Sequence, residues 1–397
     1  MACDKAGNKL GTTISIMVCH GVTLAPPTGG KVRVTRAPRR IPSKARMREG
    51  GRSLPPGILV KGARAAWRAG WHLLMSQLAP TTADGEYVRA PSAFRADGLP
   101  NTDGPRPSYR LYAGKTCPWA HRTMMVAALA SLPTETLGVT LLEPGEEGLW
   151  EFKGGPTAPG ALGCTTLREL YGLCVGGTYS GRATAPLLVQ VTEDGGGPPR
   201  IVCNESSDIA KLLNELGRRE SERMEGHDGL DLYPDSHKDE IDAWVDELYK
   251  GLNNGVYRAG FASTQSAKDR ASTDVARTLD RIEATLSTSR YLCGTRAPSL
   301  ADVFLFTTLL RFDAVYANLF GCSLRQVAAM EATYGFLRDM YQLKGVAPTC
   351  DIRGTMQQYY TTLFPLNPSG LVPLLPPSLS TDSLTAPHGR EEIDRNA

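Results

Sequence analysis

The stretch Leu111–Arg122, with the sequence LYAGKTCPWAHR, constrains the fold of this chain more than any other. It predicts a short strand, a turn and a helix that begins at Cys117-Pro118, because proline fits the first helical turn, where a backbone N–H has no partner within the helix. The residues that follow are rich in Ala, Met and Leu and contain no helix breaker before Pro133. Cys117 is therefore expected at a helix N-terminus, where free N–H groups and the positive end of the helix dipole stabilise a thiolate.

The sequence around Cys117 suits a cysteine that takes part in redox chemistry or in glutathione transfer, because both use a thiolate. On this stretch alone, the alternative is a buried cysteine that packs in front of a helix. The chain has nine cysteines, with no C-x-x-C pair and no Cys/His cluster at zinc-ligand spacing, so we predict no metal site. The wide spacing of the cysteines favours free thiols in a reducing compartment over a framework of disulfides. Six further cysteines are interpreted as packing residues: Cys164, Cys174, Cys203, Cys293, Cys322 and Cys350.

Residues 81–220 are predicted to form an α/β domain. The expected strands are Tyr109–Tyr112, Gly138–Leu142, Ala185–Val191 and Arg200–Cys203. With the helix after Cys117 and a last helix that starts at Asn204, the order is strand, helix, strand, β-hairpin, helix, which is typical of thioredoxin-like domains. The connection at residues 143–180 is rich in glycine, contains the short helical piece Leu167–Tyr171, and is long enough to indicate a functional loop.

Residues 230–370 are predicted to form an all-helical domain. Apolar residues recur at helical spacing in Thr264–Ser287. A Ser-x-x-Asp capping box that starts at Ser299 precedes the apolar run Val303–Leu310, which predicts a buried central helix. Residues 371–397, rich in Pro, Ser and Leu, are expected to form an extended tail. The other segments expected to be helical are His237–Leu252 and Leu324–Leu343.

Residues 1–80 lack a domain-like pattern and are interpreted as a targeting segment or extension that is disordered in part. Lys31–Arg52 is dense in Arg and poor in acidic residues, as organelle transit peptides are. We expect a plastid rather than a mitochondrion, or otherwise the cytoplasm. A disordered tail or a wrongly assigned gene start is the alternative. Ile58–Leu78 is expected to be the first ordered segment.

Charge and hydropathy exclude two classes of partner. Residues 1–50 hold ten Lys or Arg and two acidic residues, whereas the whole chain has a net charge of +3. The basic charge therefore belongs to the N-terminal segment and does not form a nucleic-acid-binding face. No run approaches the ~20 apolar residues that span a bilayer, so no membrane partner is expected.

Ten stretches of the sequence occur in a characteristic order. They are Gly85–Arg95, Cys117–Arg122, Trp150, Tyr179–Leu187, Asn204–Ser207, Asn253–Phe261, Arg290–Gly294, Arg311–Tyr316, Gly335–Tyr341 and Asn367–Gly370. Together they resemble the glutathionyl-hydroquinone reductases, the Xi class of omega-like glutathione transferases, over roughly residues 85–375. The resemblance implies a thioredoxin-like domain followed by an all-α domain, a homodimer, and glutathione as co-substrate.

A thioredoxin-like domain binds glutathione through three features, and the chain has a candidate for each. The residue before a cis-proline bonds the cysteinyl amide, and Ala185-Pro186 occupies that place by the resemblance. Glu205 can pair with the γ-glutamyl ammonium, and Ser206 with its carboxylate at a helix N-terminus, although plain helix capping explains the same residues. Cys117 supplies the reactive sulfur. The glutathione-contacting residues implied by the resemblance are Trp150, Arg182, Ala185, Pro186, Glu205 and Ser206.

The resemblance also implies that three tyrosines of the helical domain face Cys117. Tyr257 matches the expected proton donor, and Tyr316 and Tyr359 match two tyrosines that polarise the site and favour the thiolate. A phenol stays protonated at neutral pH, so it can donate to a thiolate or to a quinol oxygen. We therefore predict that the pKa of Cys117 lies well below the ordinary value of a thiol. Each tyrosine taken singly is also compatible with a place in the core.

The resulting hypothesis is a cysteine-type glutathione transferase that reduces glutathionyl-hydroquinones through a mixed disulfide between Cys117 and glutathione. One alternative is an omega- or lambda-like thiol transferase or dehydroascorbate reductase, which shares the cysteine but not the tyrosines. The other is a non-catalytic quinone or tetrapyrrole binder that kept the fold. The chain departs from the family pattern at Ala185, where valine is usual, and at Gln358 and Leu363, where histidine is common. These departures bear on substrate preference rather than on the glutathione chemistry.

Overall fold

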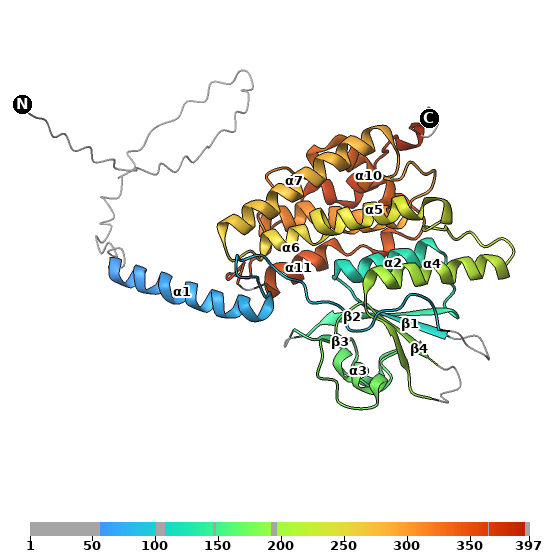
Figure 1. Cartoon of the computed structure of the whole chain (residues 1–397), viewed down its shortest axis with the longest axis horizontal. Coiled ribbons are helices and arrows are strands. Elements are labelled where there is room, and N and C mark those ends of the chain that lie inside the picture. Colours follow the sequence, from blue (N-terminus) through green and yellow to red (C-terminus); the bar gives the residue numbers. More distant parts are fainter. Residues whose placement is uncertain (1–55, 101–107, 146–147, 192–196, 364, 394–397) are drawn as a thin grey trace, which may run out of the picture. The chain divides into compact units, whose positions relative to one another are not determined.

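The structure, a computed structural model, contains a five-stranded mixed sheet in the order β3-β2-β1-β4-β5 (Figure 1). It describes residues 56–100, 108–145, 148–191, 197–363 and 365–393. The strands are β1 Ser108–Gly114, β2 Leu137–Pro144, β3 Trp150–Phe152, β4 Leu187–Val191 and β5 Arg200–Cys203. β1 and β2 run parallel, and the other neighbouring pairs are antiparallel. Four strands lie where the sequence predicts them. The sequence does not predict β3, because it has three residues and depends on pairing with β2.

Helices cover both faces of the sheet. α2 (Pro118–Leu129) and α4 (Ser206–Arg223) lie on one face, and α3 (Leu167–Val175) lies on the other (Figure 1). Successive side chains of a strand point to opposite faces. Accordingly, Leu111 of β1 joins the core shared with α2 and α4, whereas Tyr112 joins the core beneath α3. This arrangement confirms the predicted thioredoxin-like fold.

The second half of the chain is helical, as predicted. Its helices are α5 Lys238–Leu248, α6 Gly255–Gly260, α7 Gln265–Thr288, α8 Leu300–Arg311, α9 Ala317–Leu319, α10 Glu331–Gln342 and α11 Ile352–Thr362. The predicted capping box begins α8, which is buried along its whole length. Two expected helices differ in extent. His237–Leu252 gives way to a π-helical turn at Tyr249–Asn253, and Leu324–Leu343 becomes an α-helix only from Glu331.

One hydrophobic core runs through both halves of the chain. Met125 of α2, Leu213 of α4 and Phe304 of α8 belong to the same cluster of buried residues. α2 is therefore packed from two sides, by the sheet domain and by α8. As a result, even the polar residues His121 and Arg122 of α2 are buried.

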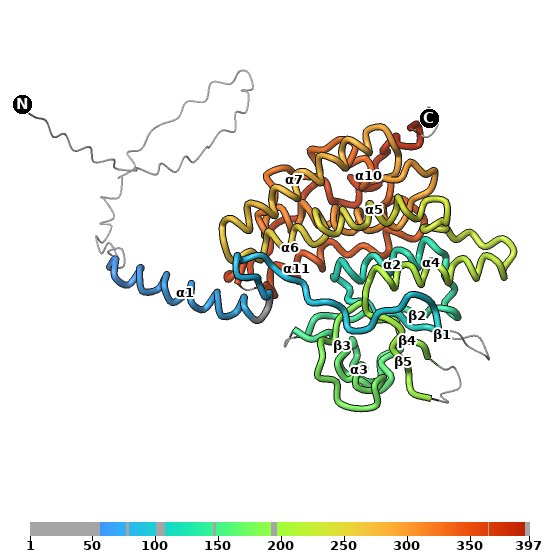
Figure 2. The backbone as a smooth tube through the Cα atoms, viewed as in Figure 1, coloured from blue at the N-terminus to red at the C-terminus, as the bar shows by residue number. Residues whose placement is uncertain are grey.

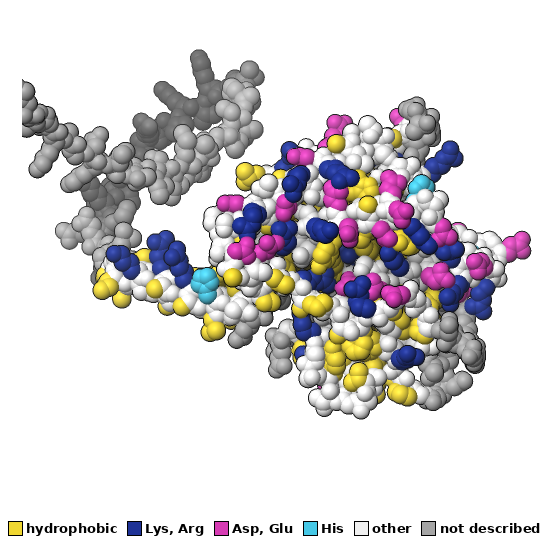
Figure 3. All heavy atoms as spheres, viewed as in Figure 1, with side chains coloured by type: hydrophobic (Ala, Val, Ile, Leu, Met, Phe, Trp, Pro, Cys, Tyr) yellow, Lys and Arg dark blue, Asp and Glu magenta, His cyan; other side chains and the backbone are white. Residues whose placement is uncertain are grey.

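α1 (Gly57–Leu78) is the segment expected to be the first ordered one. It carries Lys61, Arg64 and Arg68 and no acidic residue, and apolar side chains such as Leu73 are exposed. The space-filling view shows these basic and apolar side chains on α1, whereas Lys and Arg mix with Asp and Glu on the rest of the visible face (Figure 3). The predicted transit-like stretch lies outside the described residues. Of the helices in the described ranges, none is long and apolar enough to cross a membrane.

Residues 79–99, here called the strap, follow the end of α1 and contact both domains (Figure 2). On the helical side, the Ser263 N–H donates to the Gly85 carbonyl at 3.0 Å. On the sheet side, the Asn204 N–H donates to the Phe94 carbonyl, also at 3.0 Å. The strap is therefore held in place along its length rather than only at its ends.

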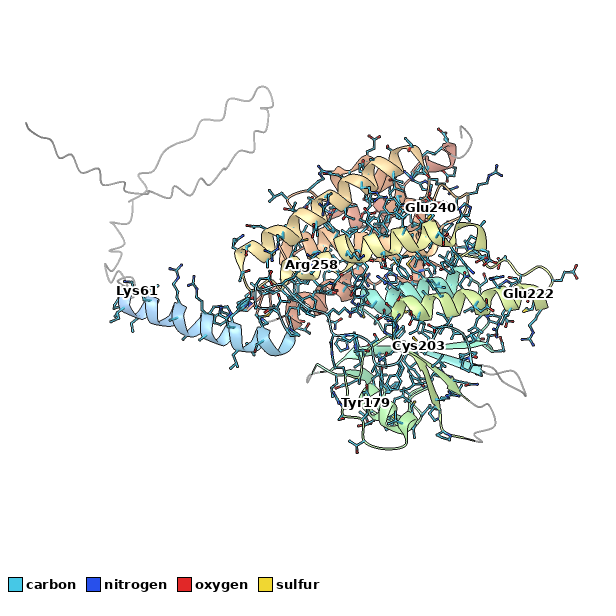
Figure 4. The ribbon with its side chains drawn as sticks, in the orientation of Figure 1. Lys61, Tyr179, Cys203, Glu222, Glu240 and Arg258 are labelled. Carbon is cyan, nitrogen blue, oxygen red and sulfur yellow. The ribbon has the colours of Figure 1, made fainter. Side chains whose placement is uncertain are left out.

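Two local features anchor the strap to the helical domain. Arg258 of α6, labelled in Figure 4, pairs with Glu86 of the strap at 2.6 Å and with Asp274 at 3.2 Å. Gly85 has φ +90°, and a Cβ atom there would lie 2.6 Å from the side chain of Thr264. Glycine is therefore required at this crossing, for its backbone conformation and for the close approach.

The C-terminal tail folds back on the helical domain. It contains the short helix α12 (Thr381–Leu384). Arg390 is buried and donates to the carbonyls of Leu286 at 3.0 Å, Ser289 at 2.6 Å and Arg290 at 2.9 Å. These carbonyls lie at and just beyond the end of α7, where they have no partner within the helix. The short helical pieces within residues 377–392 thus differ from the extended tail expected for residues 371–397, whereas residues 371–376 form no helix or strand.

Candidate active site

Cys117 lies at the N-terminus of α2, as the sequence predicts. Its N–H donates to the Gly114 carbonyl at 3.1 Å, and its carbonyl accepts from the His121 N–H at 2.9 Å, which closes the first turn of α2. The side chain is half-buried, and its Sγ donates to the Ala185 carbonyl at 3.7 Å. The Ala185-Pro186 bond is cis, as predicted. The cysteine and the residue before the cis-proline are therefore neighbours.

The pKa of Cys117 is raised rather than lowered. Burial raises the pKa of the thiol, and the backbone N–H groups of Ala120 and Trp119 and the charges of Arg311 and Arg89 oppose burial without cancelling it. The predicted lowering is therefore wrong. The sequence shows the helix N-terminus, but it does not show how deeply the helical domain covers it. At neutral pH the thiol form predominates.

The hydroxyl groups of Tyr257, Tyr316 and Tyr359 form a cluster. The oxygen–oxygen distances are 2.5 Å between Tyr257 and Tyr359, 3.3 Å between Tyr257 and Tyr316, and 3.5 Å between Tyr316 and Tyr359. Burial raises the pKa of all three phenols, so they are protonated at neutral pH. Tyr316 ends a π-helical turn (Phe312–Tyr316), a geometry that is frequent at functional sites.

The tyrosine cluster corrects one prediction about the thiol. Within the described residues, the three hydroxyls bond to one another, and the sulfur of Cys117 bonds to the Ala185 carbonyl. The expected hydrogen bonds from Tyr257 and Tyr316 to the sulfur are therefore not formed. Tyr316 still lies close enough for the charge of a Cys117 thiolate to raise its pKa further, after the larger effect of burial.

A pocket of about 380 Å³, large enough for a small organic ligand, is lined by Ala185, whose carbonyl contacts the Cys117 sulfur, but not by Cys117 itself. Four of the predicted residues line it: Trp150, Arg182, Ala185 and Tyr257. Six lining residues that the sequence does not assign are Tyr87, Arg89, Trp119, Arg168, Asn254 and Phe261. Tyr87 and Arg89 come from the strap, and Asn254 and Phe261 from the stretch Asn253–Phe261. Both stretches contribute to the family resemblance, but no local signal shows that they meet.

Three arginines make the pocket electropositive: Arg89, Arg168 and Arg182. The guanidinium of Arg89 lies 3.8 Å from the centroid of the Trp119 ring, a cation–π contact that fixes its position at the pocket wall. Glutathione carries two carboxylates, so a pocket with several guanidinium groups suits it.

Glu205 and Ser206 lie at the start of α4, which begins two residues later than predicted. The Glu205 carboxylate accepts from the Ser207 N–H at 3.4 Å and from the Ser92 hydroxyl of the strap at 2.7 Å. Burial raises the pKa of Glu205, but the hydrogen bond from Ser92 and the charge of Arg89 outweigh it, so the pKa lies below its ordinary value. The carboxylate is therefore ionised at neutral pH. It caps α4, and the same charge is available to an ammonium group.

Trp150 reaches the pocket because Gly114 has no side chain. A Cβ atom on Gly114 would lie 2.6 Å from the Trp150 ring. Gly114 ends β1, and Cys117 follows after a short turn. The indole ring thus packs against the backbone that leads to the cysteine.

The other cysteines of the described ranges fit the packing interpretation. All seven described cysteines are free thiols. Burial raises the pKa of Cys174, Cys203 and Cys293 to about 12. Over the same described residues, no group of three or more His, Cys, Asp or Glu side chains could hold a metal ion.

Comparisons with known proteins agree with this fold. Residues 265–338 match the model of the glutathione S-transferase C-terminal domain. The chain is 34% identical to glutathionyl-hydroquinone reductase YqjG of Escherichia coli, covering 84% of this chain and 98% of that protein. It is 35% identical to glutathionyl-hydroquinone reductase PcpF of Sphingobium chlorophenolicum, covering 81% of this chain and 96% of that one.

Solved structures give the same result. Glutathione S-transferase Xi from Phanerochaete chrysosporium superimposes with a TM-score of 0.66 at 33% identity, over 75% of this chain and 95% of that one. The glutathione-bound structure of YqjG superimposes with a TM-score of 0.64 at 34% identity, over 78% of this chain and 98% of that one. The chain belongs to the glutathionyl-hydroquinone reductases, the Xi class of glutathione transferases.

Proposed function

We propose that this enzyme reduces glutathionyl-hydroquinones to hydroquinones, with glutathione as co-substrate and Cys117 as the nucleophile. The observation that carries the proposal is the position of the Cys117 sulfur. It lies 3.7 Å from the Ala185 carbonyl, before the cis-proline, and Ala185 and Tyr257 both line the pocket. A glutathione bound along that backbone edge brings its own sulfur to the cysteine.

In the first step, the Cys117 thiolate attacks the glutathione sulfur of the substrate. The bond from that sulfur to the ring carbon breaks, its electron pair stays on the carbon, and the carbon takes up a proton. Tyr257 donates this proton, because it lines the pocket and burial keeps it protonated. Tyr359 and Tyr316 hydrogen-bond to the Tyr257 hydroxyl at 2.5 Å and 3.3 Å and hold it in position. The products are the hydroquinone and a disulfide between Cys117 and glutathione.

In the second step, another glutathione gives up its thiol proton, which restores the Tyr257 phenol. Its thiolate attacks the glutathione sulfur of the mixed disulfide, and the Cys117 thiolate leaves. One glutathionyl-hydroquinone and one glutathione thus give one hydroquinone and one glutathione disulfide. Glu205 binds the γ-glutamyl ammonium and Ser206 its carboxylate. The remaining glutathione contacts are assigned to Trp150, Arg182, Ala185 and Pro186.

A single-turnover experiment tests this function. The enzyme is mixed with an equimolar glutathionyl-hydroquinone, without free glutathione. We expect close to one equivalent of hydroquinone per chain, and a Cys117 peptide heavier by one glutathionyl group. Hydroquinone release that requires free glutathione and leaves no adduct on Cys117 would contradict the covalent route.

The same experiment separates the alternatives. An omega- or lambda-like thiol transferase or dehydroascorbate reductase would leave the quinol conjugate intact but turn over a glutathionylated thiol or dehydroascorbate. A non-catalytic quinone or tetrapyrrole binder would retain the conjugate unchanged. Tyr257 favours the quinol substrate, because it lines the pocket and a phenol there can protonate a ring carbon.

We further propose that the N-terminal segment directs the chain to an organelle, a plastid rather than a mitochondrion. The basic, acid-poor composition that marks Lys31–Arg52 extends into α1, with Lys61, Arg64 and Arg68. A chain that begins near Gly51 should fold and stay active, since residues 1–50 show no helical periodicity and contain no site residue. Residues 1–80 fused to a fluorescent protein should accumulate in the organelle. Diffuse cytosolic fluorescence would contradict the targeting proposal.

The homodimer expected from the resemblance stays a prediction. Sedimentation velocity of the purified chain measures it directly.

A further inference from the structure

Arg311, the last residue of α8, is buried behind the N-terminus of α2, with 3% of its surface exposed. Its Nη2 donates to the Thr116 carbonyl at 3.3 Å. Its Nη1 donates to the Thr307 carbonyl at 2.9 Å and to Nδ1 of His121 at 3.0 Å. Thr116 immediately precedes Cys117, so the guanidinium lies against the peptide that leads into the nucleophile.

The hydrogen-bond partners of Arg311 are all neutral. Burial, together with the charge of Arg311, lowers the pKa of His121 well below its ordinary value, so the imidazole is uncharged. It accepts at Nδ1, and its Nε2 donates to the Thr349 hydroxyl at 2.9 Å. Within the described ranges, no carboxylate pairs with Arg311 and its Nε has no hydrogen-bond partner. Arg290, in contrast, pairs with Asp339 at 2.8 Å. A buried cation without an anion is costly.

The charged groups around the Cys117 sulfur come from several elements. Arg311 of α8 and Arg89 of the strap both favour the thiolate. Arg89 is partly exposed, so dissolved ions screen its charge, whereas the protein encloses Arg311. Other titratable groups in this region include Tyr316, Tyr359, Cys350, Arg122, His121 and Glu205.

We propose that Arg311 is a positioning residue whose unpaired charge stabilises the anionic form of the Cys117 sulfur from the protein side of α2. The inference rests on the proposed role of Cys117 as the nucleophile. With the sulfur as a thiol or a mixed disulfide, the guanidinium has no counterion; with the sulfur as a thiolate, it has one. The charge therefore favours Cys117 both as the attacking thiolate and as the leaving group of the second step.

The test is the rate at which iodoacetamide alkylates Cys117 as a function of pH, followed by the mass of the Cys117 peptide in the full chain. Arg311→Gln removes the charge and keeps an amide donor, whereas Arg311→Lys keeps the charge. A cation favours the thiolate, so its removal raises the thiol pKa. We expect the midpoint to move up by roughly one pH unit in Arg311→Gln, and by less than about half a unit in Arg311→Lys. The shift should persist at about 1 M salt, because the site is enclosed.

Arg390→Met is the matched control, because Arg390 is also buried and donates to backbone carbonyls, but in the C-terminal tail. It should lower the melting temperature and leave the midpoint unchanged. An unshifted midpoint in folded Arg311→Gln, or an equal shift in Arg311→Lys, would overturn the inference. The readout does not use a quinol. A shifted midpoint in a chain that reduces no glutathionyl-hydroquinone would therefore refute the proposed function and leave this inference standing.

A second measurement needs no substitution at Arg311. Iodoacetate leaves a carboxylate on the Cys117 sulfur, and iodoacetamide leaves a neutral amide of nearly the same size. An unpaired buried cation favours the carboxylate, so the carboxymethylated chain should melt at a higher temperature than the carboxamidomethylated chain. The difference should remain in an Arg89→Gln background at about 1 M salt. Equal melting temperatures there would overturn the inference even if Arg311→Gln did not fold.

Discussion

Cys117→Ser is expected to abolish turnover of glutathionyl-hydroquinones, while the affinity for glutathione changes by no more than about tenfold. A serine hydroxyl forms no disulfide, so the first step lacks an acceptor for the glutathionyl group. The binding groups come from other elements, Trp150 from β3 and Glu205 from the start of α4, and the substitution leaves them in place. Steady-state kinetics measure the turnover, and calorimetric titration measures the affinity.

Cys174→Ser is the matched control for this prediction. Cys174 lies half-buried in α3, and burial raises its pKa to about 12. Its serine variant should reduce the substrate at the wild-type rate. Turnover near the wild-type rate in Cys117→Ser would refute the covalent mechanism. An equal loss in both variants would show a general defect in folding.

Glu205→Ala should raise the KM for glutathione by one to two decades, because a charge-assisted hydrogen bond contributes about 1.5–3 kcal/mol. It should also lower the melting temperature, because the carboxylate accepts from the Ser207 N–H and loss of an N-cap costs about 1 kcal/mol. Two effects of different origin are therefore expected from one substitution.

Glu205→Ser separates the two effects. Serine is a good N-cap but carries no charge, so it should restore most of the melting temperature and leave the KM high. A KM that returns to the wild-type value in Glu205→Ser would assign Glu205 to helix capping alone. The wild-type KM should stay low down to acidic pH, because the pKa of Glu205 lies below its ordinary value and the carboxylate stays ionised.

The local parts of the site could be predicted from the sequence. Pro118, followed by a run without breakers, places Cys117 at the start of α2, and apolar runs between turn signals place β1, β2, β4 and β5. The resemblance adds the cis bond before Pro186 and the three tyrosines whose hydroxyls meet, of which Tyr257 lines the pocket. Each of these features depends on residues close together in the chain or on motifs that the family shares.

The features of the site that were predicted wrongly or not at all depend on residues far apart in the chain. The pKa of Cys117 depends on how deeply the helical domain covers α2, which no local pattern encodes. The contact between Arg311 and His121 joins residues separated by 190 positions. The hydroxyl groups of the three tyrosines hydrogen-bond to one another, so they form no hydrogen bond to the Cys117 sulfur.

If the proposed targeting segment is removed by cleavage, the strap limits how far the N-terminus can be trimmed. A processing peptidase that cuts within α1 or at its end leaves the pocket lining intact. A cut only a few residues further on, past Gly85, detaches Tyr87 and Arg89 from one side and weakens their anchoring between Ser263 and Asn204. An N-terminus produced by such cleavage should therefore lie before residue 85, because the pocket needs Tyr87 and Arg89 even though the sheet begins only at β1.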